Sequence, residues 1–165
     1  MDDAVPPTSE LESREPSVED LAGLCAALNA EGARYLVIGG FAVRAAGYDR
    51  RTMDVDLLVE TTLENESKVL AAVSRLPDHA ASELQAGEIS QYVVIRVADE
   101  IVVDLMQSAS GIDYASACRE VTVHEVLGVP IPFAAPELLL RMKSGSVREK
   151  DRLDVAFLKR LLAAP

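Results

Sequence analysis

Two aspartates separated by one residue, Asp54 and Asp56, stand in an otherwise apolar, strand-like stretch over residues 53–60. Side chains two positions apart on a β-strand point to the same face, so the two carboxylates are expected side by side. Close like charges are unfavourable unless a cation neutralises them, and carboxylate oxygens are ligands that Mg²⁺ accepts. The pair therefore predicts a divalent-metal site on one face of a strand.

A glycine pair, Gly39-Gly40, stands between an apolar run at residues 35–38 and a short helix-like stretch at residues 41–46. Because glycine has no side chain, the backbone there can approach a phosphate closely, and a helix N-terminus offers free N–H groups. A lone glycine pair is more often an ordinary turn. Its position ahead of the aspartate pair favours a site where nucleotide phosphates meet a metal.

A third carboxylate, Asp104, follows the apolar residues Ile101, Val102 and Val103. An unpaired charge near the end of a buried strand would be costly. Asp104 therefore either joins the metal site or serves as a turn or capping residue, and the residues alone leave both interpretations open.

Several charged side chains flank these groups. Arg51 and Thr52 directly precede the aspartate pair, and they either contact a triphosphate or pair with the carboxylates. Lys143 follows a buried leucine run, from which a lysine side chain can extend its ammonium group to solvent. Asp151 and Asp154 share one face of the expected last helix, where Asp154 is also spaced to pair simply with Lys150.

The elements that must position these groups follow from hydrophobic spacing and from capping signals. The pattern predicts the order α-β-α-β-α-β-β-α-(β-β)-α-α, and hence an α/β (α+β) domain with a small mixed sheet and helices packed mainly on one side. The expected helices lie at 17–32, 41–46, 63–76, within 108–118, at 136–142 and at 146–162. The expected strands lie at 35–38, 53–60, 89–97, 101–106, and around 121–123 and 131.

Composition sets the outer limits. A chain of 165 residues with 49% hydrophobic residues is expected to form one domain with a real core. Residues 1–16, acidic and Pro/Ser-rich, are expected to be a disordered tail, with residues 17–165 as the single domain. The chain has no apolar run of membrane-spanning length, no secretory signal pattern, and two isolated cysteines. We therefore expect a cytoplasmic protein with reduced thiols and no membrane contact.

The charge is uneven along the chain. A net charge of -11 argues against a general nucleic-acid binder. Residues 141–160, however, carry seven basic and three acidic side chains. This segment either faces a phosphate-bearing ligand or forms a solvated helix face.

Taken in order, these motifs resemble the DNA polymerase β-type nucleotidyltransferase superfamily. The glycine pair, the stretch Arg51-Thr52-Met53-Asp54-Val55-Asp56-Leu57 and the later Asp104 are similar to its minimal bacterial members. The stretch from Ala135 to Lys143 resembles the lysine-bearing motif of the AbiEii-like toxin nucleotidyltransferases. The stretch from Arg148 to Asp154 resembles their final Arg/Lys-Asp-x-x-Asp motif.

The resemblance implies a nucleotidyltransferase fold and transfer of an NMP moiety from an NTP substrate to an acceptor hydroxyl, with two Mg²⁺ ions. It implies that Asp54, Asp56 and Asp104 bind metal and are catalytic. It also implies that a second group of residues contacts the nucleotide: Gly39, Gly40, Arg51, Thr52, Lys143 and Asp151. Gly40 stands in place of a serine that is often found in the superfamily.

The acceptor stays open at this point. The AbiEii-like resemblance implies a toxin that modifies tRNA and is paired with a cognate antitoxin. One alternative is a small-molecule acceptor, as in the similar antibiotic nucleotidyltransferases. Another is a non-catalytic nucleotide-binding or regulatory module, against which the three carboxylates argue, because a degenerate copy has no need of them.

Overall fold

A six-stranded mixed β-sheet forms the centre of the computed structural model, which describes residues 12–165. The strand order is β3-β4-β2-β1-β8-β7, and a separate two-stranded sheet pairs β5 with β6. The strands are β1 (Tyr35–Ile38), β2 (Asp54–Val59), β3 (Ile95–Ala98), β4 (Val102–Met106), β5 (Ser108–Ala109), β6 (Ile112–Asp113), β7 (Val121–Val126) and β8 (Val129–Ala134).

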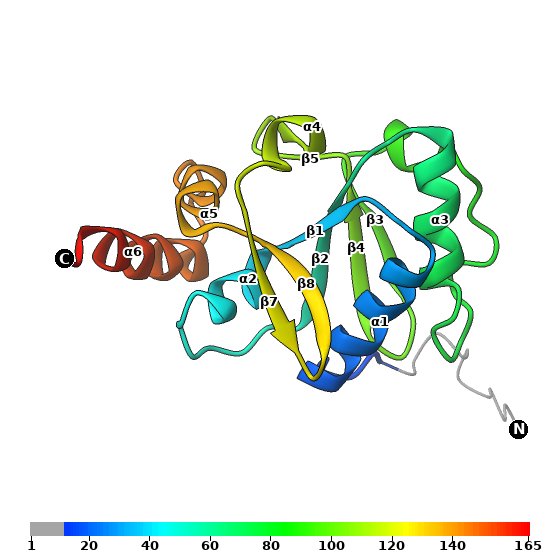
Figure 1. Ribbon diagram of the computed structural model, residues 1–165, viewed down its shortest axis with the longest axis horizontal. Helices are drawn as coiled ribbons and strands as arrows, with labels where there is room; N and C mark the ends of the chain where they lie inside the picture. The colour runs from blue at the N-terminus through cyan, green and yellow to red at the C-terminus, as the bar shows by residue number, and fades with distance from the viewer. Residues whose placement is uncertain (1–11) are drawn as a thin grey trace, which may run out of the picture.

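Two groups of helices flank the sheet (Figure 1). Helices α1 and α3 pack together and lie over the sheet, whereas α5 and α6 pack together beside α2. The predicted α/β class with a small mixed sheet is confirmed. The helices are α1 (Val18–Ala30), α2 (Gly39–Ala45), α3 (Leu63–Val73), α4 (Tyr114–Ala117), α5 (Pro136–Lys143) and α6 (Glu149–Ala163).

Strand β2 lies in the middle of the sheet and sorts its side chains between two faces. Val55, Leu57 and Val59 are fully buried and belong to the hydrophobic core. Asp54 and Asp56 alternate with them and therefore point to the opposite face. The strand thus anchors the sheet through one face and presents two carboxylates on the other.

The neighbours of β2 fix the register of the third carboxylate. Strand β4 runs parallel to β2, with Asp56 opposite Asp104, and β1 runs antiparallel to β2, with Ile38 opposite Asp56. Residues paired across adjacent strands point to the same face of a sheet. Asp104 therefore lies on the carboxylate-bearing face, and the end of β1 delivers the glycine pair to the same place.

Capping follows the sequence signals at two helices and departs from them at a third. Ser17 and Asp20 form the capping box of α1, and Thr62 caps α3 by accepting from the Asn65 N–H. The expected start of the last helix at Ser146 is wrong, because α6 begins at Glu149. The Ser146 hydroxyl donates instead to Asp151, at 2.6 Å, so it serves a side chain rather than the helix end.

The strand expected over residues 89–97 is shorter in the structure. Residues 89–91 form a 3-10 turn, and β3 begins only at Ile95. The buried carboxylate of Glu66 accepts the Gly87 and Ile89 N–H groups, which holds this backbone in a turn. A long-range contact from α3 therefore overrides the apolar, strand-like pattern.

Helix α3 ends at Val73 rather than at residue 76, because the next N–H groups of Arg75 and Leu76 bond three residues back in turns. The small β5–β6 pair was not predicted, since each strand has only two residues.

Most of the expected tail, residues 1–11, lies outside the described residues. Its described part is held against the domain: the Arg14 N–H donates to the Glu100 carbonyl, and the Arg14 guanidinium binds Asp20 and Glu100. Both cysteines are free thiols, with Cys25 in the core. Within residues 12–165, none of the helices has the length and apolar character that spanning a bilayer requires.

Candidate active site

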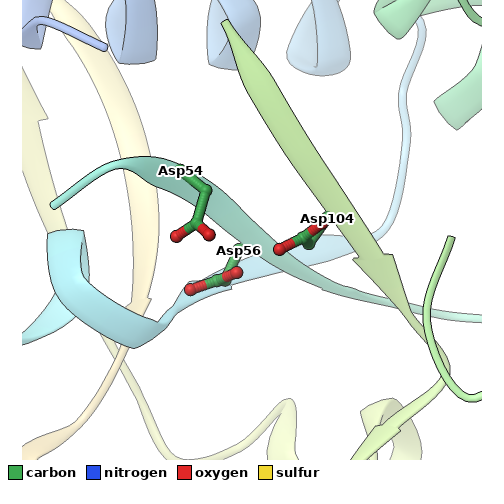
Figure 2. A group of neighbouring side chains, drawn as sticks. All are labelled: Asp54, Asp56 and Asp104. Atoms are coloured by element: carbon green, nitrogen blue, oxygen red, sulfur yellow. The ribbon is translucent and has the colours of Figure 1, made fainter. Parts of the chain in front are cut away.

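Three carboxylates converge on the exposed face of β2 and β4. Oxygen atoms of Asp54, Asp56 and Asp104 all lie within 4.8 Å of one another. Figure 2 shows Asp54 and Asp56 leaving one strand and Asp104 reaching toward them from the next. The expected convergence of these side chains is present, and the interpretation of Asp104 as a mere turn residue is not needed, since it lies within β4.

The charge at this point is unfavourable without a cation. Burial, together with the nearby charges of Asp54 and Asp104, raises the pKa of Asp56 to about 7, while Lys143 opposes the shift. A carboxyl group that resists ionisation in this way gains most when a cation approaches, because the cation stabilises its charged form. The cluster is therefore an electrostatic site for a positive ion.

One cation already contacts the cluster. The guanidinium of Arg96, on β3, donates through Nε to Asp104 Oδ1 at 3.0 Å and through Nη2 to Asp104 Oδ2 at 2.9 Å. The same Nη2 lies 3.1 Å from Asp54 Oδ2. Sequence analysis missed Arg96, because the turn expected at Asp99-Glu100 would pair it with Val103. The observed turn covers residues 99–101 and places Arg96 opposite Asp104.

The glycine pair lies close to the carboxylates. Gly39 has a φ of +68°, and a Cβ atom there would lie 2.0 Å from Asp56 Oδ2. A Cβ atom on Gly40 would lie 2.4 Å from Thr52 Oγ1. Neither position has room for a side chain, so the bare backbone and the Asp56 carboxylate share one surface.

Thr52 and Arg51 have different surroundings. Thr52 is buried, and its hydroxyl donates to the Asp54 carbonyl at 3.1 Å, at the first residue of β2. Arg51 is exposed and pairs with Glu15 rather than with the carboxylate cluster. Of the two roles considered, a ligand contact and a structural role, the contacts of Thr52 favour the structural one. The Arg51 guanidinium lies at the surface.

A second charged network joins α5 to α6. The ammonium group of Lys143 lies 3.1 Å from Asp151 Oδ1 and 3.0 Å from Asp154 Oδ2. Asp154 also pairs with Arg50, whose Nη2 donates to Oδ2 at 2.9 Å. The simple pair between Lys150 and Asp154 that the spacing allowed is therefore wrong. Asp154 is fully buried and points inward to Lys143 and Arg50.

Asp151 is held as a charged group by its donors. Burial alone would raise its pKa, but hydrogen bonds from Ser146, Arg148 and Lys143 outweigh it and lower the pKa of Asp151 to about 2. The network therefore fixes the turn between α5 and α6 through a permanent negative charge at neutral pH.

One cleft of about 700 Å³ is lined by the carboxylate cluster, the glycine pair and part of the α5–α6 network. Every predicted site residue lines it: Gly39, Gly40, Arg51, Thr52, Asp54, Asp56, Asp104, Lys143 and Asp151. The cationic side chains among its lining residues are Arg50, Arg51, Arg96, Lys143, Arg148 and Lys150. A chain with a net charge of -11 thus has a cleft suited to an anionic ligand.

The carboxylate cluster fits a hard divalent cation. All its donors are carboxylate oxygens, which Mg²⁺ prefers, and they come from only a few residues, as is common where phosphate oxygens and waters complete the coordination. The raised pKa of Asp56 and the guanidinium on Asp104 both show that this position attracts positive charge.

Comparison with known proteins agrees with this geometry. A family model described as "Nucleotidyl transferase of unknown function (DUF2204)" matches residues 17–163. A comparison with curated proteins gives no match.

Two solved structures share the fold. One is an antigenic nucleotidyltransferase-like protein from Paracoccidioides brasiliensis, with a TM-score of 0.55 and 20% identity over 90% of this chain and 77% of that one. The other is the lincosamide antibiotic adenylyltransferase LnuA bound to lincomycin, with a TM-score of 0.62 and 14% identity over 90% of this chain and 99% of that one. At such identities, the likeness shows the fold alone.

Proposed function

Because the chain belongs to the nucleotidyl transferase family whose model matches residues 17–163, we propose that its cleft transfers an NMP moiety from an NTP to an acceptor hydroxyl. The observation that carries this proposal is the convergence of Asp54, Asp56 and Asp104 within 4.8 Å in one cleft with the glycine pair. Such a cluster suits metal-assisted phosphoryl chemistry, in which positioning and charge stabilisation supply most of the rate.

The reaction balances without further reactants. The acceptor oxygen bonds to the α-phosphorus of the NTP, the bond from that phosphorus to the bridging oxygen breaks, and pyrophosphate leaves. Asp104 receives the proton of the acceptor hydroxyl, or passes it to water, as general base. Two Mg²⁺ ions held by Asp54, Asp56 and Asp104 would neutralise the phosphates and stabilise the charge that develops during displacement.

The remaining site residues bind and orient the nucleotide. The backbone at Gly39 and Gly40 lines the cleft without side chains and would let the phosphates approach it closely. The Arg51 guanidinium is the group best exposed to bind the triphosphate. It must exchange Glu15 for phosphate oxygens, an exchange that costs little at a solvent-exposed ion pair.

Lys143 and Asp151 act in a more indirect way. The Lys143 ammonium lies between two carboxylates, so its charge is largely offset, yet it still lowers the pKa of Asp56. We assign Lys143 to the electrostatics of the carboxylate cluster and nucleotide. Asp151 holds Lys143, Ser146 and Arg148 at the rim of the cleft.

Two acceptor classes are compatible with this site. The AbiEii-like motifs imply a tRNA acceptor and a toxin role with a cognate antitoxin, for which the basic segment at residues 141–160 offers local positive charge. A small-molecule acceptor is the second candidate. It is favoured by the likeness to LnuA over 99% of that chain, which shows that a fold of this size can hold a lincosamide.

Incubation with each α-labelled NTP, Mg²⁺ and either total tRNA or a panel of hydroxyl-bearing antibiotics tests the proposal. We expect label on one acceptor and release of pyrophosphate. Asp56→Asn and Asp104→Asn should each lower transfer by about a hundredfold to a thousandfold. The exposed Asp49→Asn, outside the cleft, is the matched control and should keep its activity.

No transfer to any acceptor, combined with no metal-dependent binding of NTP, would overturn the enzymatic proposal. Transfer that survives both Asn substitutions would instead overturn the assignment of the carboxylates.

A further inference from the structure

The guanidinium of Arg96 occupies the side of the carboxylate cluster that faces β3. It binds both oxygens of Asp104 and one oxygen of Asp54, at distances of 2.9 to 3.1 Å. The Asp104 side chain is only 8% exposed and Asp54 is 22% exposed, whereas Arg96 is 61% exposed. A solvent-accessible cation therefore pairs with two less exposed anions.

The fold places Arg96 there by strand register. Strands β3 and β4 form a hairpin in which Arg96 stands opposite Asp104, so both point to the same face. The next residue, Val97, points to the other face and is buried. Because β3 is an edge strand of the sheet, the long Arg96 side chain can leave the cluster for solvent without moving the backbone.

Most of the other cations of the cleft are engaged elsewhere. Among the described side chains, Arg51 pairs with Glu15, and the α5–α6 network takes up a further group: Arg50, Lys143 and Arg148 on Asp151 and Asp154. The ion pairs with Asp54 and Asp104 are made by Arg96. Its contact is bidentate on Asp104, the geometry in which arginine binds carboxylates most strongly.

We propose that Arg96 is a positioning residue that acts as the internal counter-ion of the metal-free site and competes with divalent metal for Asp104 and Asp54. The inference rests on the proposed function, because it assumes that these carboxylates take the metal. Arg96 keeps the buried carboxylates apart and oriented before loading. A divalent ion then has to displace the guanidinium, since the two cations repel each other at the same oxygens.

The consequence is a metal affinity lower than the carboxylates alone would give. Removing the guanidinium without adding a charge should therefore tighten metal binding, which is the opposite of what loss of a supporting residue does. The direction of the change in metal affinity therefore separates competition from a purely structural role. In a purely structural role, any substitution of Arg96 would weaken metal binding.

Binding of Mn²⁺ alone, measured by electron paramagnetic resonance without nucleotide, provides the test. Arg96→Met should bind Mn²⁺ about fivefold more tightly than the unmodified chain, a change of ~1 kcal/mol. Arg96→Lys should fall between the two, because a lysine keeps the charge but not the bidentate contact. The matched control is Arg148→Met, which removes one positive charge from the same cleft at Asp151 rather than at the cluster. It should change the affinity by less than about twofold.

A thermal-unfolding measurement in chelator and in excess Mn²⁺ accompanies the titration. Arg96→Met should lower the melting temperature in chelator and show a larger increase on adding Mn²⁺. Equal or weaker Mn²⁺ binding by Arg96→Met would overturn the inference while leaving the proposed function intact. Absence of Mn²⁺ binding by every variant would also overturn the inference, while the transfer assay with NTP decides the proposed function separately.

Discussion

At the scale of single residues, the site depends on side chains that are absent as much as on those present. At Gly40, the resemblance noted in the sequence would have led us to expect serine, but Thr52 leaves no room there for a side chain. The Thr52 side chain occupies the space that a Cβ atom at position 40 would need, and its hydroxyl supports the start of β2. Gly40 and Thr52 are therefore a matched pair.

This pairing makes a double-substitution prediction. Gly40→Ser alone should lower the free energy of unfolding by about 1–3 kcal/mol, because its Cβ would meet Thr52 Oγ1 and Cβ. Adding Thr52→Ala should restore part of that loss, since it removes the hydroxyl oxygen at 2.4 Å but keeps the Cβ atom at 2.6 Å. Chemical denaturation of the two single variants and the double variant measures the coupling. Strictly additive effects would show that the two positions do not share this space.

At the scale of elements, the turn between α5 and α6 is held by charge rather than by apolar packing. Lys143 ends α5, and its ammonium group meets Asp151 and Asp154 on α6, while Arg50 reaches Asp154 from the segment before β2. Buried charges of this kind add little net stability as pairs, but leaving one of them unpaired is costly. The network thus couples the last two helices to the loop that carries Arg51 and Thr52.

Acid should weaken this junction in a predictable pH range. The pKa of Asp151 is about 2 in the fold, against 3.8 for the ordinary group. A lowered carboxyl pKa adds stability above the ordinary value, and this stability is lost as the pH falls through the folded value. The stability difference between the unmodified chain and Asp151→Asn should therefore narrow by about 2 kcal/mol between pH 5 and pH 2.

Urea unfolding at a series of pH values measures that difference. Ser146→Ala removes one donor to Asp151 and should retain part of the pH dependence. A stability difference that stays constant across this range would contradict the assigned charge state of Asp151.

At the scale of the whole molecule, the sheet is the device that assembles the cleft. Parallel pairing of β2 with β4 brings Asp104 to the aspartate pair, and antiparallel pairing of β1 with β2 brings the glycine pair to Asp56. Helices α5 and α6 then close the cleft with basic side chains. The fold concentrates cations around an anionic cluster in a chain whose overall charge is negative.

Binding of substrate should stabilise the entire fold, because the cleft is lined by strands of the central sheet and by helices α5 and α6. A non-reactive α,β-methylene NTP with Mg²⁺ at about 100 times the dissociation constant should add ~2.7 kcal/mol to the free energy of unfolding. For a chain of this size the melting temperature should rise by roughly 5–10 °C. Differential scanning fluorimetry with and without chelator provides the measurement. The shift should disappear in Asp56→Asn, and a shift of equal size in that variant would place the nucleotide elsewhere.

The order of elements and the aspartate pair were predictable because they depend on local patterns. Alternation along residues 53–60 is enough to put Asp54 and Asp56 on one face, and capping signals at Ser17 and Thr62 mark helix starts through contacts a few residues away. These contacts have short sequence separation, so composition and spacing determine them. The β3–β4 hairpin was predictable for the same reason, but its register was not. Its turn covers residues 99–101 rather than Asp99-Glu100, which shifts the strand pairing by one residue.

Contacts between distant segments were decided only by the tertiary structure. The contacts of Arg96 with Asp54 and of Arg50 with Asp154 depend on which strands and helices become neighbours. A charged side chain can pair with any opposite charge that the fold brings within reach, and sequence spacing ranks only the local partners. The sequence by itself therefore determined which groups could do the chemistry, while the packing of the elements decided which cation neutralises each carboxylate.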